Sequence, residues 1–285
     1  MKPNILENLD RNEQVADVDK QRLRAFFRVA QSVQFGRIAP RQDGYIFGEH
    51  KLPRCTSILQ YDGSKAGALM EWAKRQVSGR IEQTLLEKLQ SGVLLTREEV
   101  ARICEDGLAD PDRQRDEAAE AGTGAHDLIE NWLTGYDTRP FSELPDPVQR
   151  FATAWIKSGY TCVGTEIPLV WYDANGQGFG GRLDILAYKS GKFYIGDNKT
   201  SRSVHNSYGL QIGSYKAAVE QMSDGTIKIA GGTIFHIPTL ETLNERQKKE
   251  YDKRGSLIEL KDLEDAFEQY RLLLGLYYKR NNKYF

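Results

Sequence analysis

Two aspartates and a lysine carry the most recognisable chemistry in this chain. Asp184 ends the run GRLD at 181–184, and Asp197 opens the run DNKT at 197–200, which also contains Lys199. Two carboxylates held side by side need a proton, a positive charge or a metal ion between them. Acidic oxygens suit hard divalent cations, and a lysine beside such an ion is suited to assist attack on a phosphodiester. The residue types therefore predict metal-dependent hydrolysis.

The segment between the two aspartates predicts that they face each other. A Ser-Gly pair at 190–191 is a two-residue turn signal, and β-favouring segments flank it on both sides. With this turn, Leu186 faces Ile195. Asp184 then faces Asp197, and directly opposed Cβ atoms on an antiparallel pair lie about 5 Å apart.

An ion-pair network at a strand end is the structural alternative for this cluster, and it is the more common explanation in an arbitrary hairpin. The apolar side chains of Leu186, Phe193 and Ile195 share the face of the hairpin below the charges. The carboxylates would therefore stand where an apolar face emerges from a core, which favours a metal site.

A histidine upstream is a candidate nitrogen ligand. Residues 121–130 read AGTGAHDLIE, so two glycines come shortly before His126. Glycine weakens a helix, but it lets a ligand or another backbone come close. His126 and Glu130 share one helix face at positions i and i+4. A helical histidine is usually a packing residue, whereas beside a carboxylate site it suits a metal ion.

Glu166 lies in the predicted strand that precedes the strand of Asp184. If the loop between these strands centres on Gly176, Glu166 faces Leu186 and shares the carboxylate face. A loop shifted by one residue would turn Glu166 away. Glu166 is therefore a second-tier ligand candidate, or a residue that binds a second metal ion or positions water.

Four further polar positions offer weaker signals. Gln211 and Tyr215 stand at i and i+4 of a predicted helix, and their side chains suit phosphate oxygens or a lysine amine. From spacing alone, an exposed helix surface with an amphipathic tyrosine is the preferred interpretation. His205 and His236 have no partner nearby in the sequence, and we assign them structural roles.

The elements that must position these residues predict the fold. The predicted helices span residues 18–33, 65–89, 96–107, 110–133, 146–158, 208–222 and 260–278. The predicted strands span residues 162–172, 179–188, 192–198 and 227–237, with extended pieces at 45–47 and 52–59 and a polar surface connection at 238–255. Thr96 with Glu99 predicts a capping box, and Pro111 predicts the start of the next helix.

This order of elements indicates an α/β fold with a mixed central β-sheet flanked by helices, because helices precede a strand meander that is followed by helix, strand and helix. We expect a mostly helical N-terminal region, residues 1–110, packed on a core of residues 111–285. The length of 285 residues allows a substantial buried core.

Composition excludes some classes of protein. The formal net charge at pH 7 is −1, which neither supports nor excludes DNA binding, because clustered acidic ligands mask a localised basic surface. No apolar run is long enough to span a membrane. The three widely spaced cysteines favour a reducing compartment and cannot form a four-thiolate iron–sulfur site. We therefore expect a cytoplasmic protein with no membrane partner.

The candidate residues stand in the order found in one nuclease superfamily. They are His126, Glu166, the run 181–184, the run 197–200, and Gln211 followed by Tyr215. In this order they resemble the PD-(D/E)XK nucleases of the RecB family, in particular the phage-encoded exonucleases and the similar mitochondrial genome maintenance exonucleases. The resemblance covers residues 45–278 and implies a restriction-endonuclease-like core in residues 111–285.

One segment matches this family only in part. The run LPRCTSIL at 52–59, with Trp72 downstream, resembles the Pro-Ser-Val-Thr segment of those enzymes. Arg54 and Cys55 depart from the usual residues there.

The resemblance implies a role for each matching residue. The residues implied to hold Mg²⁺ or Mn²⁺ are His126, Asp184, Asp197 and the Asn198 carbonyl. Lys199 would position the attacking water and stabilise the developing charge on the phosphate. Gln211 and Tyr215 would support the DNA and Lys199.

The leading hypothesis is a Mg²⁺- or Mn²⁺-dependent DNA exonuclease that acts on ends or single strands in phage-type replication or recombination, in a bacterial or phage-infected host cell. A structure-specific endonuclease on the same fold is the first alternative. A non-catalytic DNA-binding recombination accessory protein is the second, and the presence of Asp184, Asp197 and Lys199 argues against it. The sequence has no GxxxxGK[ST] loop, so we expect no ATP motor and a possible recombination or replication partner protein.

Overall fold

The protein forms two compact units. The computed structural model describes Leu9 and residues 12–63 and 66–281. Within these, the larger unit contains the residues up to 61 and from 125 onward, and the smaller unit contains residues 62–124. The boundary falls inside helix α5 (Arg97–Leu133), and the predicted division after residue 110 lies inside the same helix.

A five-stranded mixed sheet forms the centre of the larger unit, in the order β4-β5-β6-β7-β8. Its strands are β4 (Thr161–Tyr172), β5 (Gly178–Lys189), β6 (Lys192–Lys199), β7 (Ile229–His236) and β8 (Leu257–Leu260). All neighbouring pairs are antiparallel except β6 with β7, which is parallel. A parallel pair needs a crossover connection, and helix α7 (Asn206–Met222) supplies it. The predicted mixed central sheet is confirmed.

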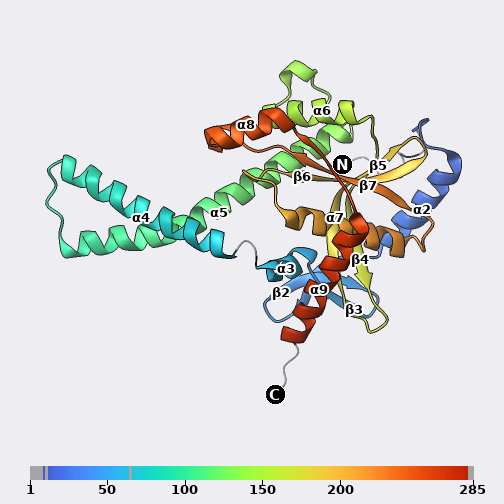
Figure 1. Ribbon diagram of the computed structural model, residues 1–285, viewed down its shortest axis with the longest axis horizontal. Helices are drawn as coiled ribbons and strands as arrows, with labels where there is room; N and C mark the ends of the chain where they lie inside the picture. The colour runs from blue at the N-terminus through green and yellow to red at the C-terminus, as the bar shows by residue number, and fades with distance from the viewer. Residues whose placement is uncertain (1–8, 10–11, 64–65, 282–285) are drawn as a thin grey trace. The chain divides into compact units, whose positions relative to one another are not determined.

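Helices cover both faces of this sheet (Figure 1). One face packs against α2 (Asp17–Gln31), α7 and α9 (Leu263–Asn281), and the other packs against α6 (Asp146–Ser158) and the last turns of α5. Alternation along β5 explains the two cores, because Leu186 belongs to the first and its neighbours Ile185 and Ala187 belong to the second. The expected flanking helices are therefore present.

The N-terminal region combines helices with a small antiparallel sheet. This sheet contains β1 (Gln34–Ala39), β2 (Gln42–Phe47) and β3 (His50–Pro53). The prediction that residues 52–59 are extended is wrong beyond Arg54, because Cys55–Leu59 form the short helix α3. Cys55 and Ile58 are both buried, and their spacing of three residues fits one face of a helix.

The smaller unit is a helical hairpin of α4 (Ala66–Gln90) and the first part of α5 (Figure 1). The predicted helix start at Lys65 lies outside the described residues. The predicted capping box is confirmed, because the Thr96 N–H donates to Glu99 Oε2 at 2.8 Å and the Glu99 N–H donates to Thr96 Oγ1 at 3.2 Å.

Helix α5 does not break at Pro111, so the prediction of two helices there is wrong. The Arg113 guanidinium donates to Asp106 at 2.8 Å and to Asp110 at 3.3 Å. These bonds tie together the turns on both sides of the proline, where the helix lacks one backbone hydrogen bond.

The segment 238–255 is more ordered than the predicted surface connection. It contains the 3-10 turn η3 (Leu240–Thr242) and helix α8 (Glu245–Arg254), which Asn244 and Gln247 cap reciprocally. Tyr251 is the buried residue that anchors this charged helix. Strand β8 follows and pairs with β7. Among the described residues, no helix has both the length and the apolar character needed to cross a membrane.

Candidate metal and catalytic site

The β5–β6 hairpin has the predicted turn and register. Leu186 pairs with Ile195, and the ladder ends one residue before the two aspartates, at the pair of Ile185 with Gly196. Beyond the ladder, the Asn198 N–H donates to Asp184 Oδ2 at 2.8 Å. The hairpin therefore brings the Asp184 and Asp197 segments together at the point where its regular pairing stops.

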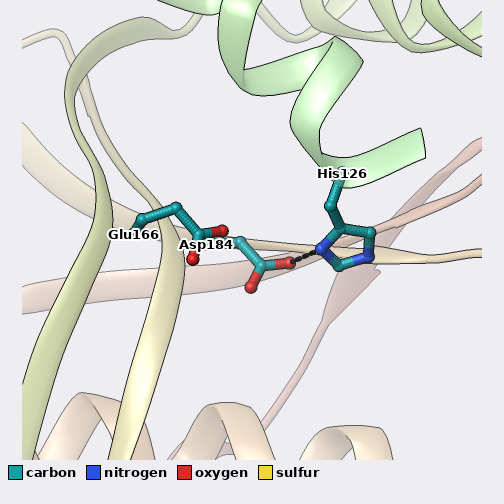
Figure 2. Close-up of side chains that lie close together, drawn as sticks. All are labelled: His126, Glu166 and Asp184. Atoms are coloured by element: carbon teal, nitrogen blue, oxygen red, sulfur yellow. Dashed lines mark ion pairs between the residues drawn. The ribbon is translucent and has the colours of Figure 1, made fainter. Parts of the chain in front are cut away.

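Three side chains from three elements gather beside this end of the hairpin (Figure 2). His126 comes from α5, Glu166 from β4 and Asp184 from β5. Each offers a ligand atom, and these atoms all lie within 4.8 Å of one another. His126 Nδ1 lies 3.4 Å from Asp184 Oδ2. A nitrogen and two carboxylates at this separation could hold a divalent cation.

Glu166 reaches the cluster by a different register from the predicted one. Leu186 pairs with Gly164, and the flanking pairs place Glu166 opposite Asp184. The loop spans residues 173–177 and is centred one residue earlier than predicted, which moves the partner by two positions. A shift of two residues keeps the side chain on the same face, so the shared face is confirmed although the predicted partner is wrong.

The pKa of Glu166 is raised in the folded protein. Burial and the nearby charge of Asp184 raise the pKa of Glu166 to about 7, against the opposing charge of Arg182. The Arg182 guanidinium lies 3.5 Å from the Glu166 carboxylate. Arg182 precedes Asp184 by two residues in the GRLD run, and this spacing is the signal that could have identified it.

Asp197 lies outside this group of three residues and pairs with Lys199. Its side chain is 1% exposed and forms an ion pair with Lys199 Nζ. Asp197 Oδ1 and Asn198 Oδ1 are buried, and neither accepts a hydrogen bond from any described residue. A buried acceptor without a donor is costly, so these two oxygens suit an electropositive ligand.

Burial and the two aspartates set the charges at this end of β6. Burial raises the pKa of Asp197, Lys199 opposes that rise, and Asp184 adds to it. For Lys199, burial alone would lower the pKa, but the charges of Asp197 and Asp184 outweigh it and hold the pKa above its usual value. Lys199, whose side chain is 17% exposed, therefore carries a partly buried ammonium group.

The Tyr208 ring lies beside Lys199, and His236 is the residue of β7 that pairs with Lys199; sequence spacing placed neither in the site. Lys199 Nζ lies 5.1 Å from the centre of the Tyr208 ring, and the Tyr208 hydroxyl donates to Ser201 Oγ at 2.7 Å. His236 Nε2 lies 2.7 Å from the Ser201 carbonyl, and Arg254 lies 2.6 Å from the other ring nitrogen. His236 is buried, which agrees with the structural role assigned to it.

Gln211 and Tyr215 are buried, so the exposed helix surface preferred from spacing is wrong. The Gln211 side chain donates to the Tyr215 hydroxyl at 3.1 Å. A Cβ at Gly181 would overlap the Tyr215 ring, so the glycine of the GRLD run lets α7 pack closely on β5. Burial raises the pKa of Tyr215 well above its usual value, and the charges of Asp197 and Asp184 contribute.

No family model and no curated protein matches the chain. What the site can do follows from its candidate ligand atoms and its lysine. They form two adjacent groups: His126, Glu166 and Asp184 on one side, and the buried oxygens of Asp197 and Asn198 with Lys199 on the other. Carboxylate and amide oxygens with one imidazole fit Mg²⁺ or Mn²⁺ better than a soft metal.

Proposed function

We propose that the protein is a Mg²⁺- or Mn²⁺-dependent deoxyribonuclease of the PD-(D/E)XK superfamily. In this proposal it is a RecB-like, phage-type exonuclease that hydrolyses phosphodiester bonds at DNA ends or in single strands. It acts in phage-type replication or recombination, in the cytoplasm of a bacterial or phage-infected host cell, with a recombination or replication protein as a possible partner.

The buried Asp197 carboxylate is the observation that carries the proposal. Its Oδ1 atom has no donor among the described residues, and its neighbour Lys199 is a partly buried ammonium group. Most buried acceptors in folded proteins have a hydrogen-bond donor, so an unsatisfied one beside a lysine favours a bound cation. An ion held by oxygens, with a lysine beside it, is an arrangement suited to phosphodiester hydrolysis.

The chain's own residues would divide the work between binding and charge stabilisation. The residues that would hold the ion are His126, Asp184, Asp197 and the Asn198 carbonyl, with Glu166 as a further ligand or a group that positions water. A bound Mg²⁺ or Mn²⁺ supplies hydroxide near neutral pH and neutralises phosphate charge. Lys199 would orient the attacking water and stabilise the negative charge that develops on the phosphate. Gln211 and Tyr215 would fix α7 against β5 beneath the reacting groups.

An assay on end-labelled DNA tests the proposal. We expect the purified protein to degrade linear DNA with Mn²⁺ and to be inactive with EDTA. Lys199→Ala should lower the cleavage rate at least about 100-fold, since loss of one donor to a developing oxyanion has that effect. DNA affinity should be largely kept. Lys189→Ala is the matched control, because this lysine lies at the other end of the same hairpin and donates to the Ser158 carbonyl.

The form of the DNA separates the two enzyme alternatives. A strict exonuclease leaves circular single-stranded DNA intact, whereas an endonuclease on the same fold cuts it. Undiminished turnover by Lys199→Ala would remove this residue from the mechanism. Cleavage that persists in EDTA would contradict the metal requirement.

A further inference from the structure

A pocket of about 310 Å³ lies in the larger unit, next to the metal-site candidates. Residues from the small sheet, α3, β5 and α7 line it, among them Phe35, Tyr45, Arg54, Thr56, Arg182 and Tyr215. Arg182 connects the pocket to the cluster, because its guanidinium lies 3.5 Å from Glu166. A polymer bound at the metal-site candidates would therefore pass Arg182 where it enters the pocket.

Two exposed guanidinium groups make the pocket cationic. Arg182 is paired with Glu166, whereas Arg54 forms no ion pair within the described part of the chain. Burial raises the pKa of Tyr45, and the charges of Arg182 and Arg54 both oppose that rise. Both cations therefore act on the same hydroxyl at the pocket wall. Arginine favours phosphate because its planar donors can bind two oxygens together.

A flat aromatic surface lies beside these charges. The Phe35 side chain is 49% exposed, and the Arg54 guanidinium stacks over its ring at 4.8 Å. The buried Tyr45 ring supports Phe35 edge-on, at 5.3 Å between ring centres. Tyr45 itself packs against Gly180, where a Cβ would overlap its ring. Tyr45 thus supports the stack of Phe35 and Arg54 on the protein side, and the stack is exposed to solvent on the other.

We infer that this pocket binds an unpaired nucleotide next to the phosphodiester that is cleaved, with Arg54 and Arg182 on its phosphate and the Phe35–Arg54 stack against its base. The inference rests on the proposed function, and it specifies single-stranded DNA as the form that occupies the site. Every base offers a flat face to an aromatic or guanidinium surface, so such binding tolerates any sequence. A base inside a duplex is already stacked on its neighbours and cannot make this contact.

Binding of a fluorescein-labelled oligothymidylate, measured by anisotropy in EDTA, tests the base contact. Phe35→Ala should weaken binding about tenfold, a typical loss for one stacked base. An oligonucleotide with abasic residues should bind the unaltered protein about as weakly. Phe35→Ala should then show little further preference between the two oligonucleotides. An equal preference in both proteins would overturn the stacking assignment.

The salt dependence of the same binding tests the phosphate contacts. Arg54→Ala and Arg182→Ala should each lower the slope of log K against log salt concentration by about 0.7, the value for one phosphate contact on a single strand. Phe35→Ala should leave the slope unchanged. Arg139→Ala is the matched control, because this arginine is ion-paired with Asp137 and does not line the pocket. Unchanged slopes in Arg54→Ala and Arg182→Ala would overturn the phosphate assignment.

The Mn²⁺-dependent cleavage assay separates failure of this inference from failure of the proposed function. If the unaltered protein cleaves DNA but the pocket variants bind single strands as tightly as it does, the pocket assignment is wrong and the nuclease proposal stands. If the unaltered protein neither binds nor cleaves DNA, both are wrong.

Discussion

Two aspartates are buried near opposite ends of the β5–β6 hairpin, and their surroundings differ. Asp19 is 6% exposed and accepts hydrogen bonds from the Arg22 guanidinium and the Tyr188 hydroxyl, both at 2.8 Å. Asp197 is 1% exposed and is paired with Lys199, but its Oδ1 atom has no donor among the described residues.

This difference separates an aspartate whose hydrogen bonds are satisfied within the protein from one that we propose binds a metal ion. The donors around Asp19 join α2 to β5 and satisfy the carboxylate within the protein. An unsatisfied buried group costs about 1–3 kcal/mol of folding free energy. A cation bound at Asp197 would offset that cost. The number of donors, rather than burial itself, therefore points to a binding function.

Substitution of Asp197 should lower activity, whereas substitution of Asp19 should lower stability. This contrast is the largest expected effect. Asp197→Asn should lower Mn²⁺-dependent cleavage by more than about 100-fold, because a lost ligand removes several kcal/mol of charge stabilisation. Asp19→Ala should lower the free energy of unfolding by about 1–3 kcal/mol, because the Tyr188 hydroxyl loses its acceptor. Urea unfolding and the cleavage rate per folded molecule measure the two effects. Full cleavage by Asp197→Asn, or inactive but folded Asp19→Ala, would contradict the comparison.

The sequence predicted the hairpin because all of its determinants are local. A two-residue turn fixes the register, and that register brings the Asp184 and Asp197 segments together without reference to the rest of the chain. The register of Glu166 depends on a longer loop, so the prediction missed its partner by two positions. The prediction also missed α8, because its sequence is charged and Tyr251 is its one buried side chain, although the capping pair Asn244 and Gln247 is a local signal for its start.

The contacts that distinguish the two aspartates join distant parts of the chain, and no spacing rule finds them. Tyr188 lies 169 residues from Asp19. Tyr208 reaches Lys199 only because α7 packs against the sheet, and the Phe35–Arg54 stack forms only when β1 and α3 come together. Sequence patterns can therefore nominate residues for a site, whereas three-dimensional packing decides which polar groups remain unsatisfied.

The pH dependence of stability should separate Glu166 from an ordinary surface carboxylate. Its pKa rises from 4.5 to about 7 in the folded protein. Between these values the folded, metal-free protein holds more protons than the unfolded chain, so this group's contribution to stability falls as pH rises. Glu166→Gln removes that contribution, so the melting temperature of the variant relative to the unaltered protein should rise from roughly pH 5 to pH 8.

Thermal unfolding in EDTA across this pH range measures the difference. The exposed Glu241 supplies the control variant Glu241→Gln, whose curve should run parallel to that of the unaltered protein. Parallel curves for Glu166→Gln would contradict the crowded environment of this carboxylate. With saturating Mn²⁺, the unaltered protein should have the higher melting temperature of the two, because it would gain metal-binding energy that Glu166→Gln partly lacks.

The smallest expected effect concerns the ring beside Lys199. The Tyr208 ring lies 5.1 Å from the ammonium group, and a cation–π contact of this kind contributes roughly 1 kcal/mol. Tyr208→Leu should therefore lower the single-turnover cleavage rate about fivefold at saturating DNA. Tyr208→Phe keeps the ring and should stay close to the unaltered protein. An equal loss in both variants would assign the effect to the hydroxyl bond with Ser201.

A double variant shows whether this ring acts through the lysine that pairs with Asp197. If Tyr208 only positions Lys199, then Tyr208→Leu adds nothing once Lys199→Ala is present, because the two side chains contribute through one interaction. An additional fivefold loss in the double variant would mean that the ring contacts DNA independently. Asp19 supplies the reference, because Asp19→Ala should show the same stability loss in the presence and absence of Lys199→Ala.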